Sequence, residues 1–147
     1  MKDSFFSAEI IINVEFYDVD SMRVVWHGNY IKFMEQARCA LLERLNCGYL
    51  EMERIKCLFP LTDLRIKYIR SFRYGERVRA VAHLTEYETC FKIRYEFFNA
   101  DTGELATKAE STQMAVDAET GESQFSTPRV FVERIERIIA EKNQRES

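Results

Sequence analysis

The chain has 147 residues, of which 46% are hydrophobic and 31% are charged, and its formal net charge is −3. These values suit one domain of ordinary size, residues 1–147, with enough apolar side chains for a core and too few glycines and prolines for a disordered segment. They argue against a nucleic-acid-binding protein, which needs a basic field, and the short apolar runs predict no membrane insertion.

The start of the chain lacks the long apolar stretch of a secretory signal, so we expect a cytoplasmic protein. The four cysteines have no C-x-x-C spacing, and we interpret them as free thiols in a reducing compartment. There are only two histidines and no cluster of residues at metal-ligand spacing. The sequence therefore predicts neither a metal site nor an organic cofactor.

The first expected element is a strand over residues 8–17, where apolar residues alternate strictly. An irregular link over 18–26 follows. From Asn29 the apolar spacing becomes that of a long helix that is apolar on most of its faces, which predicts that other elements surround it. Gly48 is the expected stop of this helix, and residues 49–55 are expected to form a short second helix.

Alternation returns after Pro60 and predicts four more strands, which cover residues 64–69, 77–84, 91–98 and 105–116. In the turn before the last strand, Gly103 is expected to supply a positive φ. Ser126-Thr127-Pro128 predicts an N-cap followed by proline at the first position of a C-terminal helix. Short turns join antiparallel neighbours, so we expect an α+β fold: a five-stranded antiparallel sheet curled around one long helix, plus a C-terminal helix.

The candidate site lies where the first strand runs into the helix. Asp18 and Asp20 end the strand, and His27-Gly28-Asn29 opens the helix. The first turn of a helix leaves backbone N–H groups without intrahelical partners, and its dipole favours anionic oxygen. Gly28 has no side chain to block an approach to these N–H groups. A carboxylate such as Asp20 facing an oxyanion site is the minimum for acyl-group hydrolysis.

Structural interpretations of the same residues stay open on spacing alone. Asp18 and Asp20 could be turn residues at the end of a strand, and Asn29 could be only an N-cap. The ring of His27 could hydrogen-bond to backbone without taking part in chemistry, so its amide is the more informative group.

The stretch 16–38 resembles the signature of hotdog-fold acyl-CoA thioesterases, in particular the 4-hydroxybenzoyl-CoA thioesterase family and its Tol-Pal-associated branch. The residues that match are Asp20, His27, Asn29, Tyr30, Glu35, Ala37 and Arg38. Segment 68–76 resembles the family's Tyr-x-x-x-x-Arg-x-x-Asp loop through Tyr68 and Arg73, with Glu76 in place of the aspartate. Arg23 departs from the pattern, because the family often has glycine at that step.

The resemblance implies the hotdog fold and hydrolysis of the thioester bond of an acyl-CoA or an acyl-carrier-protein conjugate, with coenzyme A present only as part of the substrate. It also implies a homodimer or homotetramer with the substrate at the subunit interface. Asp20 would act as nucleophile or general base, the N–H of His27 would hold the carbonyl oxygen, and Asp18 would at most support them. The expected substrate-binding residues are Gly28, Asn29, Tyr68 and Arg73.

Two other functions remain open. A dehydratase or hydratase on the same fold would need a catalytic histidine, for which His27 is the only candidate, and a non-catalytic acyl-CoA-binding protein would need no catalytic group. The basic residues between 65 and 94 are interpreted as a solvated outer surface. Their alternative role is to contact the phosphates of coenzyme A or an acidic carrier protein.

Overall fold

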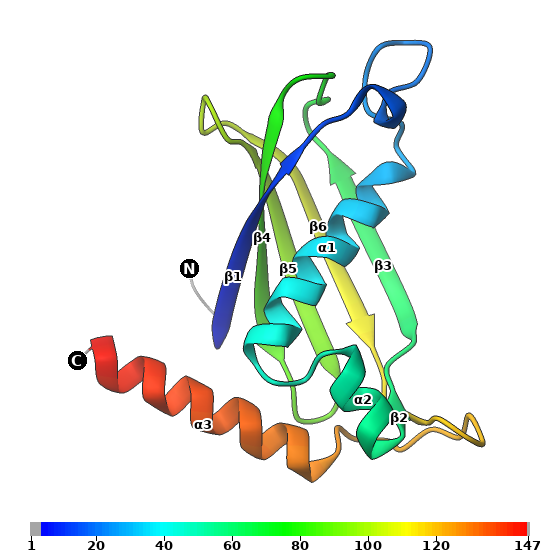
Figure 1. The fold of residues 1–147 in the computed structure, drawn as a ribbon, viewed down its shortest axis with the longest axis vertical. Coiled ribbons are helices and arrows are strands. Elements are labelled where there is room, and N and C mark those ends of the chain that lie inside the picture. The colour runs from blue at the N-terminus through cyan, green and yellow to red at the C-terminus, as the bar shows by residue number, and fades with distance from the viewer. Residues whose placement is uncertain (1–3, 147) are drawn as a thin grey trace.

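The structure is a computed structural model that describes residues 4–146. One antiparallel sheet forms its centre, and the strands in spatial order are β1 (Phe6–Asn13), β4 (Arg77–Glu86), β5 (Phe91–Asn99), β6 (Leu105–Gln113) and β3 (Leu61–Tyr68). A long helix, α1 (Asn29–Arg44), lies across the sheet and contacts β1 and β4 (Figure 1). The predicted α+β hotdog layout, with a five-stranded sheet curled around one long helix, is confirmed.

The core lies between α1 and the sheet. The predicted alternation on β4 and β5 is confirmed, since every second side chain is buried against the helix: Val78, Ala80, Ala82, Leu84, Phe91, Ile93, Tyr95 and Phe97. On α1, Phe33, Met34 and Ala37 are buried, whereas Ile31 and Glu35 are exposed. The sheet thus covers one side of the helix, and residues 4–146 of one chain do not provide the expected enclosure on all sides.

The first strand is shorter than the alternation predicts. β1 ends at Asn13, which pairs with Arg77 at the start of β4; Val14 still bonds to Gly75 and Glu76, and the residues after Val14 turn away from β4. They form instead a 3-10 turn, η1 (Phe16–Asp18), in which the N–H of Asp18 donates to the carbonyl of Glu15 at 2.9 Å. An alternating pattern makes a strand only where a neighbour completes the ladder.

Gly48 does not end α1, contrary to the prediction. The left-handed residue after the helix is Asn46, with φ 59°, and the N–H of Cys47 donates to the carbonyl of Leu42 at 2.9 Å. Asparagine tolerates the left-handed region, so it can replace the usual glycine. Gly48 has φ −71° and precedes α2 (Tyr49–Ile55), the predicted second helix.

Two short strands form a second, separate pairing. β2 (Cys57–Leu58) pairs antiparallel with β7 (Val116–Asp117). The chain leaves the main sheet after β6, where the N–H of Met114 donates to the carbonyl of Pro60 at 3.2 Å. The predicted single strand over 105–116 is therefore divided in two. A two-residue strand is too short for alternation to reveal.

The predicted C-terminal helix is α3 (Arg129–Glu146), which lies across one end of the sheet (Figure 1). The predicted cap is not formed, because the Thr127 hydroxyl is buried without a hydrogen-bond partner among residues 4–146. The N–H of Val132 donates to the carbonyl of Pro128 at 3.1 Å, and the helix begins one residue after this proline. No helix within the described residues is both long enough and apolar enough to cross a membrane.

The four cysteines are free thiols, as the sequence predicted. Cys47, Cys57 and Cys90 are buried, and Cys39 is exposed on α1. Burial raises the pKa of Cys47 to about 12, so this thiol stays protonated and unreactive at neutral pH.

Candidate functional site

The link between β1 and α1 folds into a small hairpin. The N–H of Asp20 donates to the carbonyl of Val24, and the N–H of Trp26 donates to the carbonyl of Asp18, both at 2.9 Å. Between these bonds, Val19 and Val25 form an isolated antiparallel bridge. Asp20 therefore lies on one arm of the hairpin, and the other arm continues into His27 and the start of the helix.

Arg23 at the tip of this hairpin has φ 68°, in the left-handed region. Its N–H donates to the carbonyl of Asp20 at 2.9 Å, which closes the turn. Glycine reaches this conformation without the steric cost that a Cβ imposes. The tight tip of the hairpin explains why glycine suits this step, and Arg23 keeps the same turn with an exposed side chain.

This conformation predicts opposite effects for two substitutions. We expect Arg23→Gly to raise the free energy of unfolding by up to about 1 kcal/mol, and Arg23→Val to lower it by roughly 1–2 kcal/mol, because a β-branched residue fits the left-handed region worst. Urea denaturation measures both changes. Arg65→Val is the matched control, because Arg65 is an exposed strand residue without a positive φ and the exchange should cost little there. A destabilised Arg23→Gly protein would contradict this account.

Asp18 and Asn29 hold the link against the helix. The Asp18 side chain is buried and its Oδ2 accepts the N–H of Glu15 at 2.9 Å. The side-chain nitrogen of Asn29 donates to the backbone carbonyl of Asp18 at 2.8 Å. These contacts give both residues a structural place in the link, and a contact between Asn29 and a substrate stays a prediction.

Two consecutive backbone N–H groups at the start of α1 are available to a ligand. The carbonyl of Trp26 accepts the N–H of Asn29 at 2.8 Å, and the carbonyl of His27 accepts the hydroxyl of Tyr68 at 3.0 Å. In a trans peptide the carbonyl and the N–H point in opposite directions. The N–H groups of His27 and Gly28 therefore point away from these anchors, and neither has an acceptor among residues 4–146.

The Asp20 carboxylate is half-buried in the hairpin. Its Oδ1 accepts the N–H of Met22 at 2.8 Å. Its Oδ2 has no donor within the described part of the chain, so that oxygen is free to accept a proton or to attack a carbon.

The second motif packs against the first. The N–H of Val25 donates to the carbonyl of Phe72 at 2.8 Å, which joins loop 69–76 to the hairpin. Within this loop the N–H of Arg73 donates to Glu76 Oε1 at 2.8 Å, so the glutamate closes the loop. The guanidinium of Arg73 is exposed and has no partner among residues 4–146. The structure therefore brings Tyr68 to His27 and leaves Arg73 at the surface.

Trp26 is a site residue that the sequence did not single out for a role. Its indole covers Gly28 so closely that a Cβ added at Gly28 would lie 2.2 Å from the ring. The ring centroids of Trp26 and His27 are 5.1 Å apart, and the His27 side chain is exposed. The only sequence signal for Trp26 is its position as the aromatic residue directly before His27. Gly28 is required here for the close approach of the indole.

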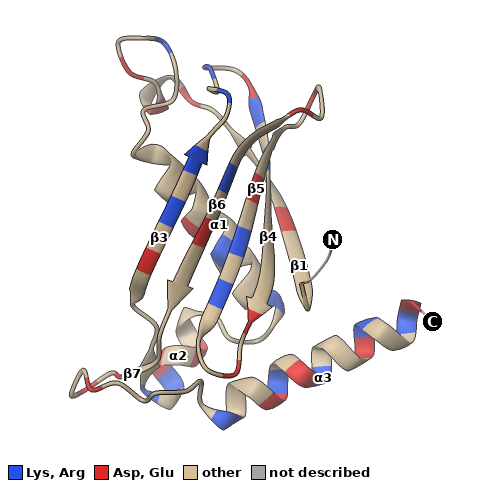
Figure 2. Ribbon diagram, turned by 180° about the vertical axis from the view of Figure 1, so that it is seen from behind, with Lys and Arg blue, Asp and Glu red and all other residues tan. Residues whose placement is uncertain are grey.

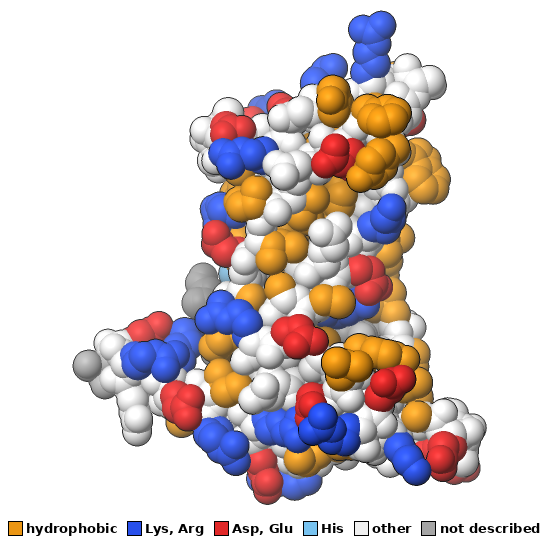
Figure 3. All heavy atoms as spheres, viewed as in Figure 1, with side chains coloured by type: hydrophobic (Ala, Val, Ile, Leu, Met, Phe, Trp, Pro, Cys, Tyr) orange, Lys and Arg blue, Asp and Glu red, His pale blue; other side chains and the backbone are white. Residues whose placement is uncertain are grey.

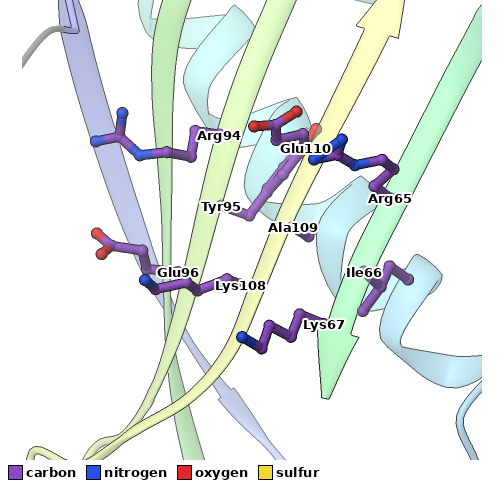
Figure 4. A pocket seen from close by; sticks show the side chains of 9 residues that line it. All are labelled: Arg65, Ile66, Lys67, Arg94, Tyr95, Glu96, Lys108, Ala109 and Glu110. Atoms are coloured by element: carbon purple, nitrogen blue, oxygen red, sulfur yellow. The ribbon is translucent and has the colours of Figure 1, made fainter. Parts of the chain in front are cut away.

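Two of the surface grooves lie on opposite sides of the sheet. On the face turned away from α1, a groove of about 390 Å³ is lined by Arg65, Lys67, Arg94 and Lys108 together with Glu96 and Glu110 (Figures 2 and 4). Its charges are mixed, and Figure 4 shows the Glu110 carboxylate beside Arg65. This agrees with the prediction of a charged outer surface.

The other groove, of about 490 Å³, lies along the open side of α1 and is mostly apolar. Leu42, Met52 and Phe59 line it, and α1 also contributes the charged side chains of Glu35 and Arg38. Glu35 is six residues from Asn29, where α1 begins, and a helix rises about 1.5 Å per residue. This groove therefore begins roughly 9 Å along the helix from Asn29, the residue that follows the two free N–H groups.

Comparison with known proteins places this geometry in a family. The model of the Thioesterase-like superfamily matches residues 14–137. The Bacillus subtilis (strain 168) protein YneP, which carries a provisional name as an acyl-CoA thioesterase, is 35% identical over 111 residues, 74% of this chain and 79% of that protein.

Solved structures have the same fold. A DHNA-CoA thioesterase from Staphylococcus aureus superposes with a TM-score of 0.80 and 27% identity, covering 94% of each chain. A hypothetical protein from the same species, characterised in complex with CoA, has a TM-score of 0.80 at 15% identity and covers 90% of this chain and 83% of its own. Because the superfamily model spans the hairpin, α1 and the whole sheet after β1, this chain belongs to the Thioesterase-like superfamily.

Proposed function

We propose that the chain hydrolyses the thioester bond of an acyl-CoA, or of an acyl-carrier-protein conjugate, at the start of α1. The observation that carries the proposal is the pair of free N–H groups at His27 and Gly28, whose peptides are anchored through their carbonyls. A thioester oxygen that accepts both N–H groups gains negative charge as the tetrahedral intermediate forms, and they stabilise that charge. Membership of the superfamily and the names of its members support the same reaction.

Asp20 supplies the second part of the reaction. Its free Oδ2 either takes a proton from a water that attacks the thioester carbon, or attacks that carbon itself and forms a mixed anhydride that water then hydrolyses. The leaving group is a thiol with a pKa of about 8.5, so the thiolate departs without a general acid. One carboxylate and one oxyanion site are therefore sufficient. The motif over 16–38 favours the 4-hydroxybenzoyl-CoA thioesterase branch within the superfamily.

A second copy of the chain is part of this proposal. β3 is an edge strand, and the exposed apolar side chains on it or directly after it include Leu61, Tyr68 and Ile69. Figure 3 shows hydrophobic side chains along the side of the molecule where Figure 1 places β3. An exposed strand edge beside apolar side chains is a surface for pairing with another chain. Sedimentation equilibrium is expected to give at least a dimer.

The rival functions have less support from the geometry. The exposed ring of His27 has no acidic partner among residues 4–146, and the other histidine, His83, pairs with Glu96 on the face of the sheet away from α1. A hydratase or dehydratase would need a histidine and an acid together beside the helix. A non-catalytic binding protein would need no free carboxylate oxygen beside the N–H pair.

Thiol release from a panel of acyl-CoAs tests the proposed reaction. The panel should contain aryl, short aliphatic and long aliphatic acyl groups, and acyl-carrier-protein conjugates of the same acids. We expect turnover with at least one class of thioester. The matching oxygen esters should be hydrolysed much more slowly. If no thioester in the panel is hydrolysed, the binding-protein alternative replaces the proposed reaction.

A further inference from the structure

The hydroxyl of Tyr68 makes the contact that anchors the peptide group between His27 and Gly28. It donates to the carbonyl oxygen of His27 at 3.0 Å, across a sequence separation of 41 residues. Tyr68 is the last residue of β3, so this contact joins the edge of the sheet to the first turn of α1. It lies in the motif matched at 68–76, for whose tyrosine the resemblance implies only a substrate-binding role.

The ring of Tyr68 is held in place by the core. It packs edge-on against Tyr30, with ring centroids 4.9 Å apart and an interplanar angle of 87°. Tyr30 is itself buried and stacks on Phe97 of β5. Desolvation raises the pKa of Tyr68, so its hydroxyl remains a donor throughout the neutral range. The ring, which is 48% exposed, is therefore supported on one side by Tyr30 of α1, and Tyr30 in turn packs on the sheet.

We infer that Tyr68 is a positioning residue, which sets the direction of the Gly28 N–H by holding the carbonyl of the same peptide group. The inference rests on the proposed thioester hydrolysis and deepens it. Since the peptide group is planar, fixing the oxygen at one end fixes the N–H at the other. Gly28 has no side chain to restrain this peptide, so the anchor must come from elsewhere.

The other free N–H has an anchor of a different kind. The peptide that contains the His27 N–H is held by the bond from Asn29 N–H to the carbonyl of Trp26, at 2.8 Å, within one turn of chain. The peptide that contains the Gly28 N–H has only a longer local bond, from Tyr30 N–H to the carbonyl of His27 at 3.3 Å. Tyr68 supplies the shorter contact to that oxygen. Loss of the Tyr68 hydroxyl should therefore loosen the Gly28 N–H and leave the His27 N–H in place.

Tyr68→Phe tests this role, because it keeps the ring and removes the donor. We expect kcat for thiol release to fall by about 10- to 100-fold with KM changed less than about threefold, since misplacing a reacting group costs rate more than ground-state binding. A raised KM at unchanged kcat would make Tyr68 a substrate-binding residue instead and would overturn the inference. The matched control is Tyr87→Phe, which removes a tyrosine hydroxyl that donates to Glu136 at 3.4 Å, far along the chain.

Amide NMR provides a readout that does not depend on turnover. In Tyr68→Phe the amide of Gly28 should shift and lose order, while the amide of His27 and the Tyr87→Phe control stay close to wild type. If the wild type hydrolyses no thioester but Gly28 responds in this way, the proposed reaction fails and the anchoring contact stands. If Gly28 does not respond, the inference fails whatever the activity.

Discussion

Asp20→Asn is expected to lower kcat for thiol release by roughly 100- to 10,000-fold, the usual range for loss of a general base or nucleophile. Asparagine has the same shape, and its amide oxygen can still accept the N–H of Met22 that Asp20 Oδ1 accepts at 2.8 Å. The hairpin should therefore persist while the free carboxylate oxygen is lost. Steady-state kinetics with the best substrate of the panel measure the change, and circular dichroism checks the fold.

Asp117→Asn is the control for this variant. Asp117 also accepts backbone N–H groups in a turn, those of Glu119 and Thr120, but it lies on β7, away from the start of α1. Its replacement should leave kcat within about twofold of wild type, because surface changes far from a site have small effects. Equal rates for wild type and Asp20→Asn would remove Asp20 from the mechanism. Incorporation of oxygen-18 into Asp20 during a single turnover would identify it as a nucleophile rather than a base.

Phe97→Ala is expected to give the largest loss of stability, about 3–5 kcal/mol of the free energy of unfolding. Phe97 is fully buried on β5 and packs against Tyr30 and Phe33, with ring centroids 6.3 Å from each. Removing this ring leaves a cavity between the sheet and the first half of α1. The free energy of unfolding of a native domain is only about 5–15 kcal/mol, so this variant should be close to unfolding.

Urea denaturation at 25 °C measures this loss. Phe98→Ala is the matched control, since the next residue on β5 lies on the opposite face, where its ring packs under the guanidinium of Arg79. We expect a loss of less than half as much there, because that face is only partly buried. Equal losses for the two variants would mean that the core is not centred between α1 and the sheet.

The parts of the fold that sequence predicts are those with a repeated apolar period. β4 and β5 alternate over their whole length, and α1 has an unbroken helical stripe, so each was identified from its own residues. The prediction failed where a distant partner decides the outcome. The first strand stops at Asn13 because β4 begins opposite it, and β7 leaves the sheet because β2 is there to pair with it.

In the candidate site, too, the sequence predicts what depends on local residues and misses what depends on distant ones. The resemblance pointed to Asp20 and to the amide of His27, and it noted Arg23 as a departure without a cause. The structure explains the family's glycine, since the φ of 68° at Arg23 is a conformation that glycine favours, and it offers no reason for the arginine. The bond from Tyr68 to His27 joins residues 41 positions apart, so no local pattern could predict it. The covering of Gly28 by Trp26 also depends on side-chain packing that spacing does not reveal.

A crystal structure of the Asp20→Asn protein with an intact acyl-CoA tests the central claim most directly. The variant should hold the substrate without cleaving it. We predict that the thioester oxygen lies about 3 Å from the N–H groups of both His27 and Gly28, with the carbonyl carbon facing residue 20. A thioester bound elsewhere, for example in the charged groove on the outer face of the sheet with the two N–H groups still free, would contradict the account.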